Sequence, residues 1–437
     1  MSAALAALAL VMVGCSSDKA DETSAPTEAV ADTAAADTGA ADTEAAPAAP
    51  EGALVIATEL PLQGASADAS ADTNRAVAMI LEAAGGKAGA YDVVVKEYDN
   101  STAAKGGWDD ATCAKNAADH VATANEVAVM GPYNSGCAKI IIPVLNQDPS
   151  GPMLMISHAN TNPGITKAWE PGEPDKYYPT GSRNYGRVIA TDDFQGAAGA
   201  QMAAKDLGVK RCIVLDDAQT YGKGVARAFA DAAKAVGIEV VAQESWDAKQ
   251  PNYTALFEGF KALNPDCVYL GGINDNNGEQ LIRDKVAVLG PNGDADPVKL
   301  IAPDGFTGYP TVQALPEAEG MFITFAGLPA SALVAAGGAG GKFVTDFKAK
   351  YGKDPASAYA IYGAAAAQYI LAAIAKSDGT RAGITKAAFS GIEIPAEESV
   401  IGKAFGIGPD GDVTVRDMSI QRLVNKVETF VKAWPVG

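Results

Sequence analysis

The stretch VAVMGPYNSGCAKIIIPVLNQDPSGPMLMIS, residues 127–157, decides the fold class. Its first residues, 127–131, form a short apolar run that predicts a buried strand, and residues 153–157 predict a second one. Between them, Ser135 opens a segment whose helical apolar spacing continues through residues 139–146. A strand, a helix and a strand in this order predict a parallel sheet that is covered by helices on both faces.

The same rhythm extends in both directions from this stretch. Upstream, we predict strands at 53–58 and 91–98 and helices at 73–84 and 111–123. Downstream, a second unit of similar design has predicted strands at 212–215, 239–243, 267–270 and 300–302 and helices at 224–236, 254–263 and 278–289. The last third adds a strand at 320–325, helices at 342–351 and 359–375, and late strands at 403–407, 419–424 and around Phe430. These late elements complete both units, so we expect the chain to cross between them more than once.

The composition is that of a large acidic protein. The chain has 437 residues, of which 48% are apolar, so two domains can each bury a core. Lys and Arg total 34 against 53 Asp and Glu, and the formal net charge is −19. A chain of this charge without a basic cluster repels nucleic acid, and we expect no nucleic-acid partner.

The N-terminus has the features of an export signal. Residues 3–13 form an apolar run that is too short to span a bilayer, and Gly14-Cys15-Ser16-Ser17 follows it. A Cys after a small residue resembles a lipoprotein cleavage box, although Met12 stands where Leu is usual and no Lys or Arg precedes the run. We predict that residues 1–15 are a lipoprotein signal peptide and that Cys15 carries lipid; an ordinary cleaved signal peptide is the alternative.

Residues 16–52 consist almost entirely of Ala, Asp, Thr, Glu, Ser and Pro, without an aromatic residue. Such a segment cannot bury enough apolar surface to offset its ordering entropy, and we predict a disordered acidic tether. We therefore expect the protein to lie outside the cytoplasm, in the periplasm or at the cell surface, anchored to the membrane by its N-terminal lipid.

Four cysteines remain beyond the lipidation site, and an even number in an exported protein indicates disulfides. Each half of the chain holds two of them, so we predict the pairs Cys113–Cys137 and Cys212–Cys267. The second pair joins the starts of two predicted strands, where two buried free thiols are the alternative.

Several short motifs accompany the strand–helix rhythm. In chain order they are Pro61-Leu-Gln-Gly64, Gly131-Pro-Tyr-Asn-Ser-Gly-Cys137, Met155-Ile-Ser-His-Ala-Asn-Thr-Asn-Pro163, Asp193-Phe-Gln-Gly196, Tyr221-Gly-Lys-Gly224, Tyr269-Leu-Gly-Gly272, Ala302-Pro-Asp-Gly305 and Tyr359-Ala-Ile-Tyr-Gly-Ala364. In these motifs and their order the sequence resembles the substrate-binding proteins of branched-chain amino-acid ABC transporters, in the type I periplasmic-binding superfamily. The resemblance covers nearly all of residues 53–437.

The resemblance implies an α/β fold of two Rossmann-like lobes with parallel-sheet cores, joined by a hinge of three crossovers. We place the crossovers near residues 187–192, 320 and 402. The resulting boundaries assign 53–190 and 321–402 to lobe 1, and 191–320 and 403–437 to lobe 2. The ligand then lies between the lobes, and in open α/β sheets the crevice beyond the strand carboxyl ends is also the general ligand site.

The first lobe supplies candidate ligand contacts after two of its strands. Ser135 opens a helix, where free backbone N–H groups and the positive helix end suit a carboxylate. The resemblance implies that Ser135 holds the ligand carboxylate, with a plain helix N-cap as the alternative. It also implies ligand contacts from the Ala159 carbonyl and the Thr161 hydroxyl, although Asn and Pro nearby suit an ordinary turn. We expect Tyr133 and Gln63 to line the same wall.

The second lobe supplies two further candidates. The resemblance implies that the ring of Tyr221 covers the ligand; a core tyrosine is the alternative. Asp304 follows the strand at 300–302 and would pair with the ligand ammonium; a solvated loop carboxylate is the alternative. Ile273 stands where many relatives have an aromatic residue, so the wall that faces the ligand side chain differs in this chain.

The sequence carries no motif for metal binding or catalysis. His120 lies on an amphipathic helix, and His158 has no Cys or carboxylate partner at metal-ligand spacing. No Ser, Cys or Asp nucleophile stands in a motif with a paired base. We expect no metal and no cofactor.

These observations together predict a solute-binding protein. We expect it to capture a small amino-acid-like molecule by lobe closure and to deliver it, as a monomer, to the permease subunits of an ABC importer. The alternatives are a ligand-sensing receptor component of the same fold and an exported amidase or hydrolase. The resemblance makes leucine, isoleucine and valine the default ligands, while small polar amino acids, amides, urea and aromatic acids remain open.

Overall fold

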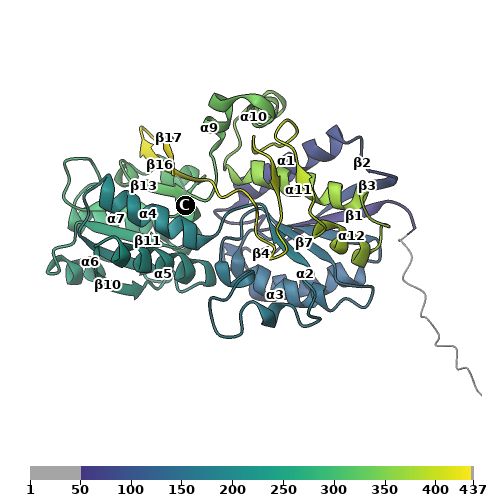
Figure 1. Ribbon diagram of the computed structural model, residues 1–437. Coiled ribbons are helices and arrows are strands. Elements are labelled where there is room, and N and C mark those ends of the chain that lie inside the picture. The colour runs from purple at the N-terminus through teal and green to yellow at the C-terminus, as the bar shows by residue number, and fades with distance from the viewer. Residues whose placement is uncertain (1–50, 435–437) are drawn as a thin grey trace, which may run out of the picture. The chain divides into compact units, whose positions relative to one another are not determined.

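The computed structural model describes residues 51–434 (Figure 1). The predictions for the signal peptide and Cys15, and for nearly all of the tether, fall outside the described residues. Among the helices of the described part, none combines the length and the apolar character that crossing a bilayer requires.

The first sheet has six strands in the order β2-β3-β1-β6-β7-β8. Its strands are β1 (Leu54–Leu60), β2 (Lys87–Ala88), β3 (Tyr91–Asp99), β6 (Glu126–Met130), β7 (Leu154–Ser157) and β8 (Tyr185–Arg187). All pairs are parallel except β2 with β3, so the carboxyl ends of five strands lie at one edge.

Alternating side chains of this sheet bury two helical layers. Leu54 and Ile56 belong to the core that contains α1 (Ala67–Ala83) and α11 (Tyr359–Ala375). Ala57 belongs to the opposite core, with α2 (Asp110–Ala122) and α3 (Ser135–Asn146). The sheet is therefore covered on both faces, as the apolar strands predict.

The second sheet has seven strands in the order β10-β9-β11-β12-β13-β16-β17. They are β9 (Arg211–Asp216), β10 (Glu239–Ser245), β11 (Cys267–Gly271), β12 (Lys299–Ala302), β13 (Phe322–Phe325), β16 (Met418–Val424) and β17 (Val427–Trp434). The first five run parallel, and β16 and β17 are antiparallel additions. The helices packed with this sheet are α4 (Asp192–Lys205), α5 (Thr220–Ala235), α6 (Thr254–Lys261) and α7 (Gly278–Leu289). In Figure 1 these helices surround the teal and green sheet.

The first crossover lies between Arg187 and Asp192, as predicted, but the other two lie later in the chain than the sequence suggests. The strand β13 pairs with β12 and β16, so the second sheet extends past Gly320 to Phe325. Residues 403–413 also remain with the first sheet, since the carbonyl oxygen of Gly411 accepts a hydrogen bond from the amide of Arg187 at 2.9 Å. The second and third crossovers therefore follow Phe325 and Val413, and the boundaries at 320 and 402 were placed too early.

The remaining elements fill the surface around the two sheets. They are β4 (Ser101–Thr102), β5 (Gly107–Trp108), α8 (Pro310–Ala314), α9 (Ala330–Ala336), α10 (Gly338–Tyr351), α12 (Arg381–Ala388), β14 (Glu393–Ile394) and β15 (Phe405–Gly406). Both predicted disulfides are present, Cys113–Cys137 between α2 and α3 and Cys212–Cys267 between β9 and β11.

Candidate functional site

A small pocket lies where the carboxyl edges of the two sheets face each other. Its wall consists of Tyr133, Asn134, Ser135, Ala159, Tyr221, Ile273, Asp304, Gly305 and Tyr359. Tyr221 is partly buried and the others are buried. Most of these residues directly follow a strand, which is where side chains from parallel strands converge. Six residues singled out in the sequence are thereby brought together, namely Tyr133, Ser135, Ala159, Tyr221, Ile273 and Asp304.

The first turn of α3 forms one side of this pocket. The N-cap residue Asn134 makes no side-chain hydrogen bond to the helix, and the first turn contains no acidic residue. Ser135 is 2% exposed, and its Oγ accepts a hydrogen bond from the amide of Asn162 at 3.4 Å. The first N–H groups of α3 thus have no capping side chain, and a helix start in this state favours an anionic group.

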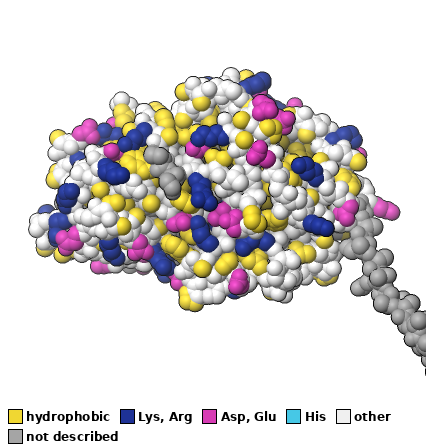
Figure 2. All heavy atoms as spheres, viewed as in Figure 1, with side chains coloured by type: hydrophobic (Ala, Val, Ile, Leu, Met, Phe, Trp, Pro, Cys, Tyr) yellow, Lys and Arg dark blue, Asp and Glu magenta, His cyan; other side chains and the backbone are white. Residues whose placement is uncertain are grey.

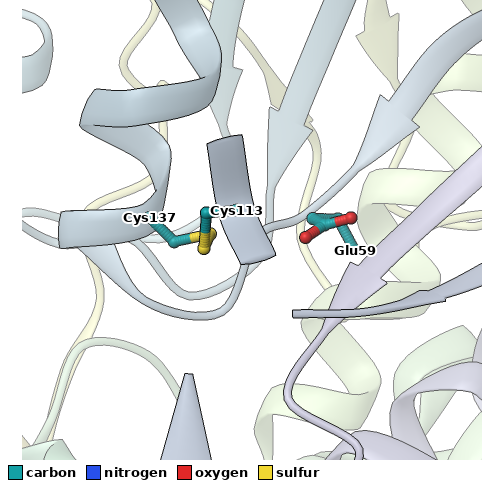
Figure 3. A group of neighbouring side chains, drawn as sticks. All are labelled: Glu59, Cys113 and Cys137. Atoms are coloured by element: carbon teal, nitrogen blue, oxygen red, sulfur yellow. A yellow bond between two sulfur atoms is a disulfide. The ribbon is translucent and has the colours of Figure 1, made fainter. Parts of the chain in front are cut away.

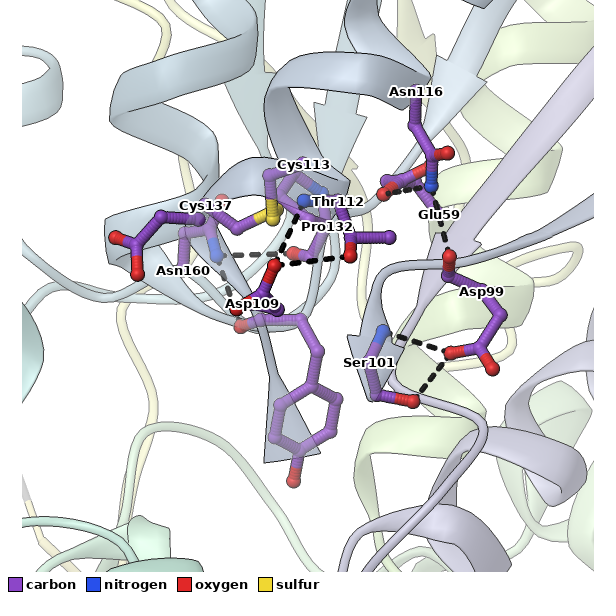
Figure 4. Close-up of a disulfide and its surroundings, with 12 residues drawn as sticks. Glu59, Asp99, Ser101, Asp109, Thr112, Cys113, Asn116, Pro132, Cys137 and Asn160 are labelled. Carbon is purple, nitrogen blue, oxygen red and sulfur yellow. Dashed lines mark hydrogen bonds between the residues drawn. A yellow bond between two sulfur atoms is a disulfide. The ribbon is translucent and has the colours of Figure 1, made fainter. Parts of the chain in front are cut away.

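A second loop is fixed against this helix start. The Nδ2 atom of Asn160 donates to the carbonyl oxygens of Pro132, at 3.0 Å, and Tyr133, at 2.9 Å (Figure 4). The Cys113–Cys137 disulfide lies beside these contacts and joins α2 to the first turn of α3. The wall around Ala159 and Ser135 is therefore held by side-chain bonds within the first lobe.

Asp304 supplies the negative charge of the pocket. It is 1% exposed, and its carboxylate accepts hydrogen bonds from the hydroxyl groups of Tyr221 and Tyr359. Burial raises the pKa of Asp304, and these two bonds oppose the rise only in part. Asp304 forms no ion pair with any Lys or Arg of the described residues, so its charge is free to pair with a cationic ligand.

Thr161 is not part of the pocket wall. The residue is fully buried, and its carbonyl oxygen accepts a hydrogen bond from the amide of Asp192 at 2.9 Å. Asp192 is also fully buried, and its two carboxylate oxygens and the Thr161 hydroxyl have no hydrogen-bond partner in the described part of the chain. Burial raises the pKa of Asp192 well above its usual value, and the nearby charge of Asp304 adds to this. Sequence reasoning did not single out Asp192.

Gln63 is not part of the pocket wall. Its side chain is exposed, and its Nε2 donates to Oδ2 of Asp99 at 2.7 Å. Tyr359 takes part in the wall instead, as the first residue of α11. The only sequence signal for Tyr359 was its place at the start of a motif, which does not reveal which strand ends it faces.

A side chain that follows a strand of the second sheet, Asp275, contacts the start of α1. Asp275, shortly after β11, accepts hydrogen bonds from Ser66 Oγ at 3.0 Å and from Tyr309 Oη at 2.6 Å. The N-cap residue of α1 is Ser66, whose side chain makes no cap bond within its own helix. Asp275 therefore places a carboxylate at this helix start, a favourable electrostatic arrangement.

His158 packs behind the pocket. Its ring is fully buried, lies 5.6 Å from the ring of Tyr133 between centroids, and makes no hydrogen bond within the described residues. Burial lowers the pKa of His158 to about 3, so the ring is neutral. Without a carboxylate or a nucleophile beside it, this histidine lacks the partners of a catalytic base.

One group of side chains has the composition of a metal site, namely Glu59, Cys113 and Cys137 (Figure 3). The two sulfur atoms are bonded to each other in a disulfide, so neither is a thiolate ligand. Glu59 also accepts hydrogen bonds from Asn116 at 3.1 Å and from His120. As it stands, the group does not fit a structural zinc site, which needs four ligands.

A larger hollow lies elsewhere, between residues 354–358 and β17. Its acidic groups are Asp354, which pairs with Lys348 at 2.8 Å, and Glu428. The Glu428 carboxylate accepts hydrogen bonds from Gly308 N at 2.8 Å and Gln313 Nε2 at 2.9 Å. On the face shown in Figure 2, Lys and Arg side chains are interspersed with Asp and Glu side chains. The small pocket is the candidate site because residues that follow strands of both sheets converge on it.

The sequence matches the family model described as Periplasmic binding protein over residues 54–428. The Leu/Ile/Val-binding protein BraC3 of Rhizobium johnstonii is 30% identical over 164 residues, which are 36% of this chain and 41% of that protein. The Leu/Ile/Val/Thr-binding protein of Salmonella typhimurium is 30% identical over 200 residues, which are 43% of this chain and 50% of that protein. The matches thus span about half the length of these curated relatives.

Solved structures share the fold over most of the chain. A leucine binding protein from Thermotoga maritima has a TM-score of 0.73 at 22% identity, covering 87% of this chain and 98% of its own. A solute-binding protein from R. palustris in complex with benzoate has a TM-score of 0.71 at 18% identity, covering 87% and 96%. A branched-chain amino acid transporter substrate-binding protein from Streptococcus pneumoniae, in complex with isoleucine, has a TM-score of 0.70 at 19% identity, covering 87% and 98%.

Proposed function

The chain belongs to the periplasmic binding protein family, and from this premise we propose that it is the extracytoplasmic solute-binding component of an ABC importer. It captures a small amino-acid-like molecule between two hinged lobes and delivers it to the permease subunits. A ligand that contacts both lobes favours the closed state, and the permease responds to that state. No bond of the ligand is made or broken.

The observation that carries this proposal is the position of Ser135 and Asp304 on one pocket. Ser135 follows a strand of the first sheet, and Asp304 follows a strand of the second. The uncapped start of α3 suits a carboxylate, and the buried, unpaired carboxylate of Asp304 suits an ammonium group. A zwitterion satisfies both sides at once and bridges the lobes.

The space left in the pocket is small. Its volume is about 20 Å³, enough for about one water molecule and far below the about 300–1,000 Å³ that is typical of ligand pockets, so a bound amino acid requires the lobes to move apart or the wall side chains to shift. Ile273 is the larger of two aliphatic side chains on the wall, which also carries Tyr133, Tyr221 and Tyr359. Leucine, isoleucine and valine are the first candidates, because the curated relatives carry these names. Small polar amino acids and amides are the next to test.

We further propose that the N-terminal lipid on Cys15 keeps this monomer near its permease. A ligand-sensing receptor component of the same fold is the second candidate function, and an exported amidase is a third. Pull-down of permease subunits with ligand-loaded protein separates transport from sensing, and an ammonia-release assay on amide ligands addresses the amidase.

Calorimetry of the purified protein tests the function directly. The panel contains leucine, isoleucine, valine, threonine, glycine, acetamide, urea and benzoate. We expect a zwitterionic amino acid to bind best, and Ser135→Ala and Asp304→Asn each to weaken it more than about tenfold, because each change removes a charge-assisted hydrogen bond. Benzoate or urea as the best ligand, with unchanged binding in Asp304→Asn, would contradict the zwitterion proposal.

A further inference from the structure

Arg187 is a fully buried arginine whose side chain has four hydrogen-bond partners. It ends β8, the last strand of the first sheet before the chain enters α4. Its Nη1 donates to the carbonyl oxygens of Asn160, at 2.7 Å, and Asn162, at 3.0 Å. Its Nη2 donates to the hydroxyl of Thr166. One guanidinium group therefore holds both sides of the loop that follows β7.

That loop carries the pocket wall. Ala159 lines the pocket, and the Thr161 carbonyl binds the amide of Asp192 at the start of α4. The Nδ2 atom of Asn162 reaches the second lobe and donates to the carbonyl oxygen of Thr220, at 3.2 Å, next to Tyr221. The loop is thus in contact with both halves of the candidate site.

The other side of Arg187 faces a crossover segment. Its Nε donates to Oδ1 of Asp412 at 2.9 Å, and its own amide donates to the carbonyl oxygen of Gly411. Burial opposes the ionisation of Asp412, but the charges of Arg187 and Lys167 and a bond from Thr166 keep its pKa below the usual value. The pair is therefore charged, and a buried charged pair fixes the orientation of both side chains.

We propose that Arg187 is a positioning residue of the ligand pocket, which holds residues 159–162 in their binding conformation and links them to the crossover segment at 411–412. This inference rests on the proposed function. Arg187 itself does not line the pocket, so it acts through the loop. A fixed loop lowers the ordering entropy that ligand binding has to overcome.

Arg381 provides a matched control within the same lobe. It is 5% exposed, pairs with Asp148, and donates to the carbonyl oxygens of Glu126, Val121, His120 and Thr123. These partners lie away from the pocket wall. Arg187→Lys and Arg381→Lys each keep a charge in place of a buried guanidinium fork, so a general loss of stability affects both variants alike.

The experiment compares three full-chain variants, Arg187→Lys, Asp412→Asn and Arg381→Lys. Thermal unfolding gives stability, amide hydrogen exchange of the ligand-free protein gives loop order, and calorimetry with L-leucine gives affinity. In Arg187→Lys we expect the amides of 159–164 to exchange at least tenfold faster and leucine to bind at least tenfold more weakly. In Arg381→Lys both quantities stay within twofold of the wild type despite a similar loss in Tm.

The Asp412→Asn variant keeps the hydrogen bonds from the Arg187 guanidinium group to Asn160 and Asn162, and removes only the negative charge that pairs with it. We expect an intermediate result, with about threefold changes in loop exchange and affinity, and this variant decides the question if Arg187→Lys does not fold. If the amides of residues 159–164 exchange at the same rate in the Arg187→Lys or Asp412→Asn variant as in Arg381→Lys, the inference is wrong, whatever the affinity for leucine. If the wild type does not bind leucine, leucine is not the ligand of the proposed function. The exchange rates of residues 159–164 then still test whether Arg187 orders the loop.

Discussion

The hydroxyl of Tyr359 donates a hydrogen bond to Oδ2 of Asp304, and this bond connects the two lobes. Tyr359 begins α11, which packs with the first sheet, whereas Asp304 follows β12 of the second. The hydroxyl of Tyr221 satisfies the other oxygen of the same carboxylate. Donors from both lobes therefore support the negative charge that we propose to pair with a ligand ammonium.

This support predicts how binding depends on pH. Burial raises the pKa of Asp304, and the two tyrosine hydroxyls hold it lower than burial alone would. As pH falls through that pKa, the carboxyl group becomes neutral, so affinity for a zwitterionic amino acid should decrease. Tyr359→Phe removes one donor, and we expect its loss of affinity to begin at a higher pH than in the wild type.

Calorimetry between about pH 4 and pH 8, with the best amino acid of the panel, measures both profiles. Asp304→Asn is the control, since it should bind weakly with a flat profile over this range. An unchanged acid limb in Asp304→Asn would assign the titration to another group, such as Asp192.

The contact between Asp275 and Ser66 predicts a second kind of binding defect. Asp275 is not on the pocket wall, and its bond with Ser66 joins the loop after β11 to the start of α1. Under the proposed function this bond favours closure of the lobes. Asp275→Asn should therefore weaken every ligand by the same factor, about tenfold, because one charge-assisted bond is worth about 1.5 kcal/mol and only closure is affected. Calorimetry with three ligands of different size measures this.

Glu279→Gln is the matched control for Asp275→Asn, since Glu279 lies on α7 and, within residues 51–434, pairs only with Arg283 of its own helix. We expect it to leave all affinities within twofold. Loss of selectivity in Asp275→Asn, with some ligands unaffected, would show that Asp275 contacts ligand and would contradict a role in closure alone.

The sequence could predict much of the site because strand ends are local features. Ser135, Ala159 and Asp304 each follow an apolar strand, and parallel strands bring their carboxyl ends to one edge. Tyr359 has no such signal, since its place on the wall depends on how α11 packs across the first sheet. The contacts of Ser135, Ala159, Asp304 and Tyr359 with a ligand remain predictions.

The crossovers could not be located from the sequence for a related reason. The strand Phe322–Phe325 is mostly apolar and buried on both faces, so it suits either sheet, and only its hydrogen bonds to β12 and β16 decide between them. Likewise, nothing local indicates that Gly411 would pair with Arg187 across the chain. Long-range pairing of this kind is set by tertiary packing, which a single sequence does not encode in its local pattern.

A buried histidine predicts how stability depends on pH. His120 is fully buried between Glu59, at 3.2 Å from its Nε2, and Glu126. Burial lowers the pKa of His120, but the bonds to Glu126 and Glu59 raise it overall above 6.5. Its contribution is therefore fully present below about pH 6.5 and is lost as pH rises through the raised pKa.

Urea unfolding at about pH 5.5 and pH 9 tests this effect in His120→Gln. We expect the variant to lose about 3 kcal/mol at the lower pH and less at the higher one, since it breaks a buried ion pair only where the wild type has one. His158→Phe is the control, and its effect should have the opposite sign. Because burial lowers the pKa of His158, the wild-type histidine opposes folding below about pH 6.5. Its replacement should therefore be more favourable to stability at the lower pH than at the higher one. Equal losses for His120→Gln at both pH values would refute the charged network.

The two disulfides predict separable effects on stability and affinity. Cys113–Cys137 closes a loop with a sequence separation of 24, and Cys212–Cys267 one of 55. Chain entropy then assigns them about 3.5 and about 4 kcal/mol of stability, so replacing either pair by serine should lower the urea midpoint similarly.

Only Cys137 lies in the first turn of α3, next to Ser135, so only the first double variant should also bind the amino acid more weakly, by about threefold or more. Cys212 and Cys267 lie at the other ends of their strands, away from the pocket, and their double variant should keep wild-type affinity under conditions where it is fully folded. Equal affinity in both double variants would mean that α3 keeps its start in place without the disulfide.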